Sequence, residues 1–342
     1  MSDRSGIIMA HTLFVLLDGM EDDPNPALGG KKPYQVARMP FIRSKCPHLN
    51  MTSGKGYTQL FLNEFWTGHP PETPRAALEA AGLSMNVSEG RKAFRLSPAW
   101  IRDGQVVWAY DVDDRADMLM ECMNRNLSIL KDREPEIKFF VHGRSVLTME
   151  CQEDVPDGPQ APVDGPYVRP LHVLEEFINR VSEENGGLTV YPWGVGTPKR
   201  SYPCYRGLED LHAVSNSPTA LGVAATLGHH ITFAEELEDR FPIAKRYLED
   251  HDVFLHLDEV DEYSHQKDPM KKIAVLERID SLMEEYFSDA ERMVVFVDHG
   301  TSCVTGTHIL MDVPFRTNLG CFGDGRYIKT SDIVPTVLEA KE

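Results

Sequence analysis

The sequence lacks long hydrophobic runs, has few cationic side chains and contains no paired-cysteine motif. None of its apolar stretches approaches the roughly 18 residues that a membrane-spanning helix needs. Its 342 residues carry 35 Lys and Arg against 53 Asp and Glu, which gives a formal charge of -18. Nucleic acids and anionic membranes select basic surfaces, so neither is an expected partner. An anionic substrate would have to be bound by local cations, either metal ions or a few placed Arg and Lys side chains.

The six cysteines are scattered along the chain and form no C-x-x-C motif. In a chain of this size the pattern is typical of reduced thiols in a cytosolic protein, so a cytoplasmic location is expected. The apolar stretch Ile7–Leu17 is interrupted by His11 and lacks the charged start and the small-residue cleavage site of a secretory signal. It is therefore predicted to be a strand.

The order of the predicted elements indicates a core with an inserted domain. In residues 1–93 and 186–342, strand-like apolar runs alternate with helical segments, which is the pattern of a doubly wound, mostly parallel α/β sheet. Residues 94–185 differ, because W-I-R-D-G-Q-V-V-W predicts a hairpin and a stretch rich in Pro, Gly and Asp follows at 151–170. This segment is predicted to be a smaller α+β domain inserted into the core.

Acidic residues follow three of the apolar runs. Asp18 comes after F-V-L-L, Asp261 after F-L-H-L-D-E-V, and Asp298 after V-V-F-V. Because the carboxyl ends of parallel strands meet at one edge of a sheet, these side chains should lie close together. Histidines accompany them, and mixed carboxylate and imidazole ligands suit zinc or manganese. Taken singly, each residue would be read as a cap or loop residue. Together they predict two divalent ions, Mn²⁺ or Zn²⁺, with the ligands Asp18, Asp261, His265, Asp298, His299 and His308.

The same motifs carry a family resemblance. L-L-D-G near the start, D-E-x-x-H-x-x-D-P-x-x-K late in the chain, and V-D-H-G-T followed by a histidine resemble the alkaline phosphatase superfamily. Within it, the chain is most similar to the archaeal-type, cofactor-independent phosphoglycerate mutases. E-A-A-G, A-F-R, H-G-R and Y-P-W-G-V-G match that family more loosely. The resemblance covers most of the chain, and it implies an alkaline phosphatase-like core with an inserted substrate-binding or cap domain.

The resemblance also implies roles for the candidate ligands and for a nucleophile. Asp261, His265 and His308 would hold one metal, while Asp18, Asp298 and His299 would hold the other. In such enzymes a hydroxyl side chain takes the phosphoryl group covalently. Thr58 is the candidate nucleophile, because it is predicted to open a helix as its N-cap. An ungapped alignment instead places Gln59 at that position, and the acidic partner of the family's nucleophile is missing.

Basic residues are the candidates for substrate binding. Arginine offers a bidentate fork to phosphate or carboxylate, and imidazole titrates near neutrality. His142 is therefore the candidate acid–base residue, with a structural role as the alternative, and Arg115 could equally be a surface salt-bridge residue. The predicted substrate-binding residues are Lys55, Arg95, Arg115 and Arg144.

Three functions remain open from the sequence. The first is dimetal-dependent phosphoryl transfer on a small anionic metabolite, as in a phosphoglycerate mutase. The second is a phosphatase or phosphonate-type hydrolase that uses a metal-bound water. The third is a metal-binding homologue that has lost phosphoryl transfer. In the first two cases the partner is a small phosphorylated or phosphonate-like anion, and the oligomeric state is not predicted.

Overall fold

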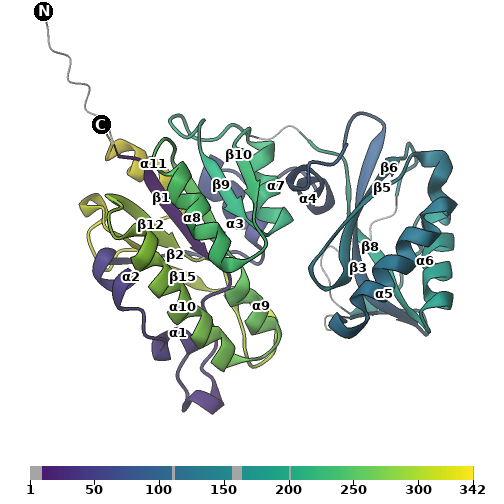
Figure 1. The fold of residues 1–342 in the computed structure, drawn as a ribbon, viewed down its shortest axis with the longest axis horizontal. Helices are drawn as coiled ribbons and strands as arrows, with labels where there is room; N and C mark the ends of the chain where they lie inside the picture. Colours follow the sequence, from purple (N-terminus) through teal and green to yellow (C-terminus); the bar gives the residue numbers. More distant parts are fainter. Residues whose placement is uncertain (1–9, 110–111, 156–163, 200–201, 342) are drawn as a thin grey trace, which may run out of the picture. The chain divides into compact units, whose positions relative to one another are not determined.

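The computed structural model describes residues 10–109, 112–155, 164–199 and 202–341, and the chain forms two compact units. Unit 1 combines Met1–Pro71 with Tyr202–Glu342, and unit 2 is the intervening stretch Glu72–Ser201 (Figure 1). Unit 1 contains all six predicted metal ligands, so its construction determines the candidate site.

Unit 1 is built on a seven-stranded, mostly parallel sheet. Five neighbouring strands run parallel, and two antiparallel strands extend the sheet beyond β12. The central strand, β1, is buried over all six of its residues, which explains its unbroken apolar sequence T-L-F-V-L-L. The strands in spatial order are β10 (His230–Phe233), β9 (His212–Ser215), β11 (Val253–Leu257), β1 (Thr12–Leu17), β12 (Arg292–Phe296), β15 (Asp312–Thr317) and β2 (His48–Ser53).

Helices cover both faces of this sheet, as Figure 1 shows. On one face α3 (Thr58–Thr67) stacks its Phe65 ring on Phe296 of β12 with ring centroids 4.3 Å apart. The buried aromatic rings at this contact fix the start of α3 relative to the ends of the central strands. The remaining helices of unit 1 are α1 (Pro33–Val36), α2 (Pro40–Lys45), α7 (Pro218–Thr226), α8 (Leu237–Tyr247), α9 (Glu259–His265), α10 (Pro269–Phe287) and α11 (Thr330–Glu339).

The predicted mostly parallel sheet with alternating helices is confirmed in unit 1, with one correction at α3. Thr58 was expected to be the N-cap, but Tyr57 occupies that position with φ −152° and ψ 147°, and Thr58 is the first helical residue. The N-cap preference of threonine was overridden because the hydroxyl of Thr58 bonds to Asp18 and not to the backbone of its own helix.

Unit 2 is an antiparallel sheet with helices, as expected for an α+β domain. β3 lies near its centre and pairs with three other strands. The strands are β3 (Arg91–Arg102), β4 (Gln105–Trp108), β5 (Glu136–Phe140), β6 (Arg144–Glu150), β7 (Gly165–Pro166) and β8 (Leu188–Gly196), and the helices are α4 (Arg75–Gly82), α5 (Ala116–Asn126) and α6 (His172–Glu184).

Unit 2 extends beyond the predicted insert, 94–185, at both ends. β3 begins at Arg91 and β8 continues to Gly196, and the two strands pair antiparallel. Helix α4 packs against both strands. Because paired strands and the helix that covers them share one core, the chain passes between the units near residues 72 and 201.

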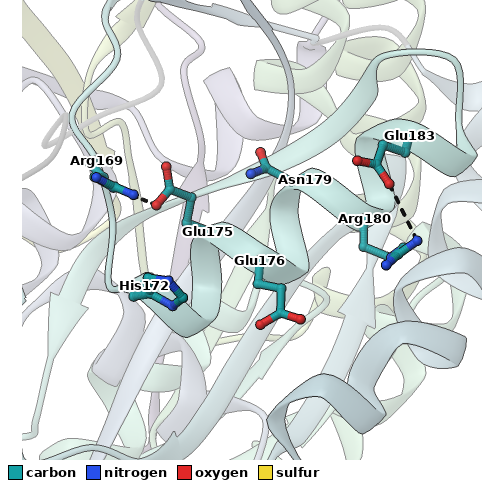
Figure 2. Close-up of a pocket in the computed structure, with 7 residues that line it drawn as sticks. All are labelled: Arg169, His172, Glu175, Glu176, Asn179, Arg180 and Glu183. Atoms are coloured by element: carbon teal, nitrogen blue, oxygen red, sulfur yellow. Dashed lines mark hydrogen bonds and ion pairs between the residues drawn. The ribbon is translucent and has the colours of Figure 1, made fainter.

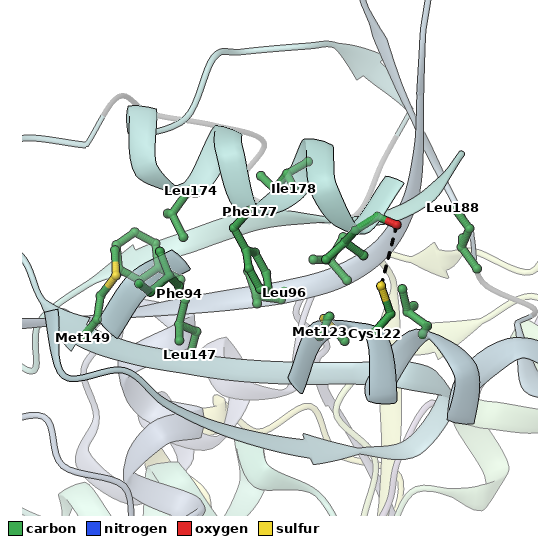
Figure 3. Close-up of a cluster of buried hydrophobic side chains, with 14 of the residues drawn as sticks. Phe94, Leu96, Cys122, Met123, Leu147, Met149, Leu174, Phe177, Ile178 and Leu188 are labelled. Carbon is green, nitrogen blue, oxygen red and sulfur yellow. Dashed lines mark hydrogen bonds between the residues drawn. The ribbon is translucent and has the colours of Figure 1, made fainter. Parts of the chain in front are cut away.

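One face of the unit 2 sheet carries a closed hydrophobic core. Figure 3 shows Leu174, Phe177 and Ile178 of α6 lying over Phe94 and Leu96 of β3, and all five side chains are fully buried. Helix α5 contributes further buried side chains to the same cluster. Apolar side chains therefore fill the space between this face of the sheet and the helices that cover it.

Two observations concern the membrane and the cysteines. In the described part of the chain, no helix is both long enough and apolar enough to cross a bilayer. The six cysteines all lie in that part, and none forms a disulfide bond.

A buried histidine predicts acid sensitivity of unit 1. Neither ring nitrogen of His229 makes a hydrogen bond. Burial, partly opposed by Glu209 and reinforced by His230, lowers the pKa of His229 from its ordinary 6.5 to about 4. Between these pH values the unfolded chain binds more protons than the folded protein, so the free energy of unfolding falls as the pH drops from 6.5 toward 4, by up to about 3 kcal/mol.

We expect His229→Leu to remove this part of the pH dependence. The measurement is denaturant unfolding of both proteins from pH 7 to pH 4 in the presence of a chelator. Replacing the exposed His69 by Leu is the matched control and should leave the pH dependence as it is. Equal slopes of stability against pH for His229→Leu and the unmodified protein would refute the assignment.

Candidate metal centre

The candidate ligands meet at the carboxyl ends of three adjacent parallel strands. β1 lies between β11 and β12. Asp18 directly follows β1, Asp261 lies on the short helix α9 after β11, and Asp298 and His299 come just after β12. His308, in the two-residue strand β14 (His308–Ile309), comes back to the same place through its pairing with β13 (Gly300–Thr301). The strand-end positions in the sequence therefore translate into one cluster.

One group of ligands consists of Asp18, Asp298 and His299, all buried. The His299 Nε2 atom lies 3.2 Å from Asp18 Oδ1 and 3.4 Å from Asp298 Oδ2. Gly19 follows Asp18 with a left-handed φ of 61°, and a Cβ atom there would collide with the Asp261 carboxylate. The D-G pair therefore allows the Asp18 loop to approach Asp261.

The second group consists of Asp261, His299 and His308, so His299 belongs to both groups. His265 adjoins it, with its Nε2 atom 3.1 Å from Asp261 Oδ2 and 3.2 Å from His308 Nε2. The rings of His299 and His308 stack with centroids 4.1 Å apart. All six predicted ligands thus lie in one continuous cluster.

The three histidines are anchored in the same way. His265 Nδ1 lies 2.8 Å from the Gly306 carbonyl oxygen, and His308 Nδ1 lies 2.8 Å from the Gly56 carbonyl oxygen. His299 Nδ1 lies 3.1 Å from Thr301 Oγ1. A carbonyl oxygen can only accept, so each Nδ1 facing one carries the proton, and each ring presents Nε2 to the cluster. Metal-ligating histidines are typically oriented by this kind of outer hydrogen bond.

Two buried carboxylate oxygens test whether a cation fits here. Asp18 Oδ1 and Asp298 Oδ2 are inaccessible to solvent and accept no hydrogen bond. An unpaired buried carboxylate oxygen is costly unless a cation compensates it. Both oxygens face the same imidazole, that of His299. The donor set of three carboxylates and three imidazoles, with two buried oxygens that accept no hydrogen bond, fits divalent metal ions.

In the cluster, protonated histidines balance part of the negative charge of the aspartates. Burial by itself lowers the pKa of His299, but Asp298 and Asp18 outweigh it and raise the pKa to about 10. For His265, Asp261 likewise outweighs burial and raises the pKa to about 9. Burial, together with the charge of Asp18, raises the pKa of Asp298 to about 6. The cluster therefore holds more negative charge than its buried position favours, which is the condition that cation binding relieves.

Thr58 lies at this cluster. Its Oγ1 hydroxyl donates a hydrogen bond to Asp18 Oδ2 at 3.2 Å and lies 3.4 Å from His299 Nε2. The helix that Thr58 opens points its N-terminus toward the cluster, where the helix dipole favours an anion. Of the neighbouring residues Thr58 and Gln59, Thr58 is the one whose hydroxyl donates to Asp18.

Two supporting residues were not predicted. His256, fully buried on β11, places Nε2 2.7 Å from Asp18 Oδ2, and its Nδ1 lies 2.8 Å from Ser215 Oγ. Thr301 donates to Asp261 Oδ1 at 2.5 Å. The sequence contained one indication of the role of His256, which is a single histidine inside the apolar run F-L-H-L. A buried imidazole needs a hydrogen-bond partner, so a histidine at this position implies a polar neighbour.

Two predicted substrate residues are held inside unit 2. The guanidinium of Arg95 is buried, pairs with Glu79 at 2.9 Å and lies over the Phe140 ring. Burial lowers the pKa of Arg95, Glu79 opposes this, and the charges of nearby Arg75 and Arg144 lower it further. Arg115 donates to the Asn185 carbonyl oxygen at 2.7 Å.

The other three candidates lie in more open positions. Arg144 and His142 are partly exposed, and His142 has a left-handed φ of 59°, which is uncommon outside glycine. Lys55 forms an ion pair of 2.7 Å with Glu64 in unit 1. The structure therefore brings together the predicted metal ligands and Thr58, while the predicted anion-binding residues are spread over both units.

A surface depression of about 380 Å³ lies on unit 2 along helix α6 (Figure 2). Its arginines pair with neighbouring acids, Arg169 with Glu175 at 2.6 Å and Arg180 with Glu183 at 3.5 Å. A third acid, Glu176, also lines it. The depression contains no candidate ligand and has no excess positive charge for an anionic substrate.

The chain is similar in sequence to known proteins. The sequence model of the Metalloenzyme superfamily matches residues 229–318, which include five of the six candidate ligands. The chain is 24% identical to the 2,3-bisphosphoglycerate-independent phosphoglycerate mutase of Picrophilus torridus, with 90% of this chain and 88% of that protein aligned. It is 26% identical to the protein of the same name from Methanothrix thermoacetophila, with 88% of each covered.

Solved structures show the same fold. The PH0037 protein from Pyrococcus horikoshii superposes with a TM-score of 0.70 at 19% identity, covering 98% of both chains. The cofactor-independent phosphoglycerate mutase from Thermoplasma acidophilum superposes with a TM-score of 0.57 at 18% identity, covering 98% of this chain and 100% of that one. Residues 229–318 thus match the Metalloenzyme superfamily, and the chain as a whole is similar in sequence and fold to cofactor-independent phosphoglycerate mutases.

Proposed function

We propose that the protein is a dimetal-dependent phosphotransferase that moves a phosphoryl group within a small anionic metabolite, as a phosphoglycerate mutase does. The observation that carries the proposal is the Thr58 hydroxyl, which lies 3.2 Å from Asp18 and 3.4 Å from His299 within the cluster of candidate ligands. Both neighbours belong to the group Asp18, Asp298 and His299. A nucleophilic hydroxyl needs activation of this kind, because its own pKa lies far above neutrality.

The ligands follow from the two groups. Asp18, Asp298 and His299 would hold one ion, and Asp261, His265 and His308 would hold the other, with His299 in contact with both groups. When bound, two divalent ions would lower the pKa of a nearby hydroxyl and stabilise the charge of an in-line phosphoryl transfer. Mn²⁺ and Zn²⁺ both suit these ligand types.

In the proposed reaction the Thr58 oxygen forms a bond to phosphorus while the bond from phosphorus to the substrate oxygen breaks. Asp18 Oδ2 accepts the hydrogen bond of Thr58 and orients the hydroxyl, whose proton is released to solvent. The departing substrate oxygen takes up a proton, for which His142 is the proposed donor. Its left-handed backbone fits such a role, since strained backbone is concentrated at functional sites. Return of the phosphoryl group to a second hydroxyl of the same molecule completes the cycle.

Unit 2 is proposed to supply substrate binding. Arg75 and Arg95 both pair with the single carboxylate of Glu79, and the charge of Arg144 also acts on Arg95. These guanidinium groups gather positive charge in one part of a chain of charge -18, and a guanidinium offers a bidentate fork to phosphate or carboxylate. Arg144 is the proposed direct contact because it is partly exposed. Lys55 and Arg115 are further proposed contacts, and each would have to exchange its present partner for the substrate.

Hydrolysis is the second candidate function, and one observation favours it. The residue after Thr58 is Gln59, so the acidic partner of the family's nucleophile is absent. A weaker nucleophile would shift the balance toward water as the acceptor of the phosphoryl group. The two functions use the same ligands and differ in the product.

The test is ³¹P NMR of 3-phosphoglycerate incubated with zinc- or manganese-loaded protein and quenched with a chelator. We expect 2-phosphoglycerate to appear, at a rate that falls by at least about 100-fold when the metals are removed beforehand. Inorganic phosphate as the main product would establish the hydrolase instead. An unchanged substrate with metal-loaded protein would contradict phosphoglycerate as the substrate, and the same result across other small phosphoesters would contradict phosphoryl transfer altogether.

A further inference from the structure

Lys272 of helix α10 is a fully buried cation next to the candidate metal centre. Its Nζ atom donates to the Gly19 carbonyl oxygen at 2.9 Å, to Asp22 Oδ2 at 2.9 Å and to the Thr301 carbonyl oxygen at 3.2 Å. The Glu21 carbonyl oxygen lies 3.4 Å away. One ammonium group, which has three protons to donate, is therefore surrounded by four oxygens.

These oxygens belong to the two loops that carry the ligands. Gly19 directly follows Asp18, and Thr301 comes two residues after His299. Asp22 extends the connection, because its Oδ1 atom accepts a hydrogen bond from the Cys303 backbone at 3.0 Å. The ammonium and the Asp22 carboxylate thus tie the loop after β1 to the loop after β12 at points close to both ligand groups.

The sequence around Lys272 fixes where the ammonium lies. Asp268 caps α10, its Oδ1 accepting from the backbones of Met270 and Lys271. Pro269 is the first helical residue, where proline is favoured. The motif D-P-x-x-K therefore starts the helix at a defined residue and places Lys272 in its first turn, directed toward the ligand loops.

A gain in stability alone does not account for the buried ion pair of Lys272 and Asp22, because burying two charges costs free energy. A buried pair is often no more stabilising than apolar residues of similar size, so stability alone does not favour Lys272 and Asp22 over a hydrophobic contact. Directional hydrogen bonds to several backbone oxygens do what an apolar side chain cannot, which is to hold two loops at one spacing.

We infer that Lys272 and Asp22 form a positioning pair that sets the spacing of the two ligand loops and thereby the affinity for metal. The inference rests on the proposed function, since it concerns the same ligands. Lys272 itself touches no candidate ligand side chain in any contact described above, so it acts through the loop backbones.

The test compares Zn²⁺ affinity and stability in four variants of the full chain. Lys272→Met with Asp22→Asn removes both charges together, and Asn keeps an oxygen for the Cys303 backbone. Asp22→Asn alone is a milder change in case the double variant does not fold. Lys341→Met is the matched control, because Lys341 pairs with Asp252 at 2.6 Å at the opposite ends of the same strands. Lys272→Arg retains the charge with different geometry.

Zn²⁺ affinity is measured by competition with a chromogenic chelator, and stability by denaturant unfolding in EDTA. We expect the double variant to bind Zn²⁺ about 10- to 100-fold more weakly than the unmodified protein, Asp22→Asn about tenfold more weakly, and Lys272→Arg more tightly than the double variant. Lys341→Met should lose stability without a change in Zn²⁺ affinity.

A folded double variant, or a folded Asp22→Asn protein, with unchanged Zn²⁺ affinity would overturn the positioning role, whatever its stability. Absence of Zn²⁺ binding by the unmodified protein would overturn the proposed metal centre and this inference together. The two failures are distinguishable, because the first is read from a variant and the second from the unmodified chain.

Discussion

A Thr58→Ala protein is expected to keep its metals and to lose phosphoryl transfer by about 10³-fold or more, because removing a nucleophile usually costs at least that much. The Thr58 hydroxyl donates to Asp18 and lies 3.4 Å from His299. Asp18 also retains its contacts to His256 and His299. Metal stoichiometry from elemental analysis should therefore match that of the unmodified protein.

Two variants separate chemistry from helix stability. Thr58→Ser keeps the hydroxyl and should retain most of the transfer rate. Thr67→Ala, at the other end of α3, removes a hydroxyl that bonds to the Asn63 carbonyl oxygen at 2.6 Å and should leave the rate unchanged. Mass spectrometry of protein quenched during turnover should find phosphate on Thr58. A Thr58→Ala protein with full transfer activity would refute the covalent mechanism and favour water as the nucleophile.

A His299→Ala protein is expected to lose both ions, because His299 belongs to both ligand groups. The affinity for each should fall by at least about 100-fold, since loss of a ligand exceeds the effect of losing an outer partner. His308→Ala, in contrast, removes a member of one group only and should reduce the stoichiometry from two ions to one. Isothermal titration with Zn²⁺ and elemental analysis give the affinity and the count.

A third histidine variant controls for nonspecific binding. His251 lies in the same unit, partly exposed, where its Nδ1 atom bonds to Asp210 at 2.9 Å. His251→Ala should bind two ions as tightly as the unmodified protein. A His299→Ala protein that still bound two ions would refute the proposed assignment of ligands.

The location of the cluster was predictable, because it depends on a rule of sheet geometry. Apolar runs that end in Asp18 and Asp298 define buried parallel strands, and parallel strands end at one edge. His256 was not nominated, since nothing local distinguishes a histidine that orients a carboxylate from one that merely fills a strand. Its role depends on Asp18, which is 238 residues away in the sequence.

The contacts of the predicted substrate-binding residues in unit 2, in contrast, could not be predicted from the sequence. Arginine was read as an anion ligand, but Arg95 meets Glu79, 16 residues away, inside the unit. That pairing depends on how α4 lies on β3, which no local pattern specifies. The predicted boundary at residue 94 falls inside β3 for a similar reason, since Arg91 starts the strand without an apolar signal of its own. The positions of side chains at the ends of parallel strands were therefore predictable from the sequence. The contacts of side chains that depend on how a helix packs on a sheet were not.

The insertion of unit 2 has a consequence for the order in which the protein can assemble. β1 is made first, yet its two sheet partners, β11 and β12, begin at Val253 and Arg292. During synthesis unit 2 is complete and can fold from its own sequence-local contacts, while the most apolar strand of unit 1 still has no neighbours. The Gly19 backbone donates to Asp298, which lies 279 residues further along the chain. Such contacts close late, so the ligand cluster cannot assemble before His308 has been made, and β1 is exposed to aggregation until its partner strands follow.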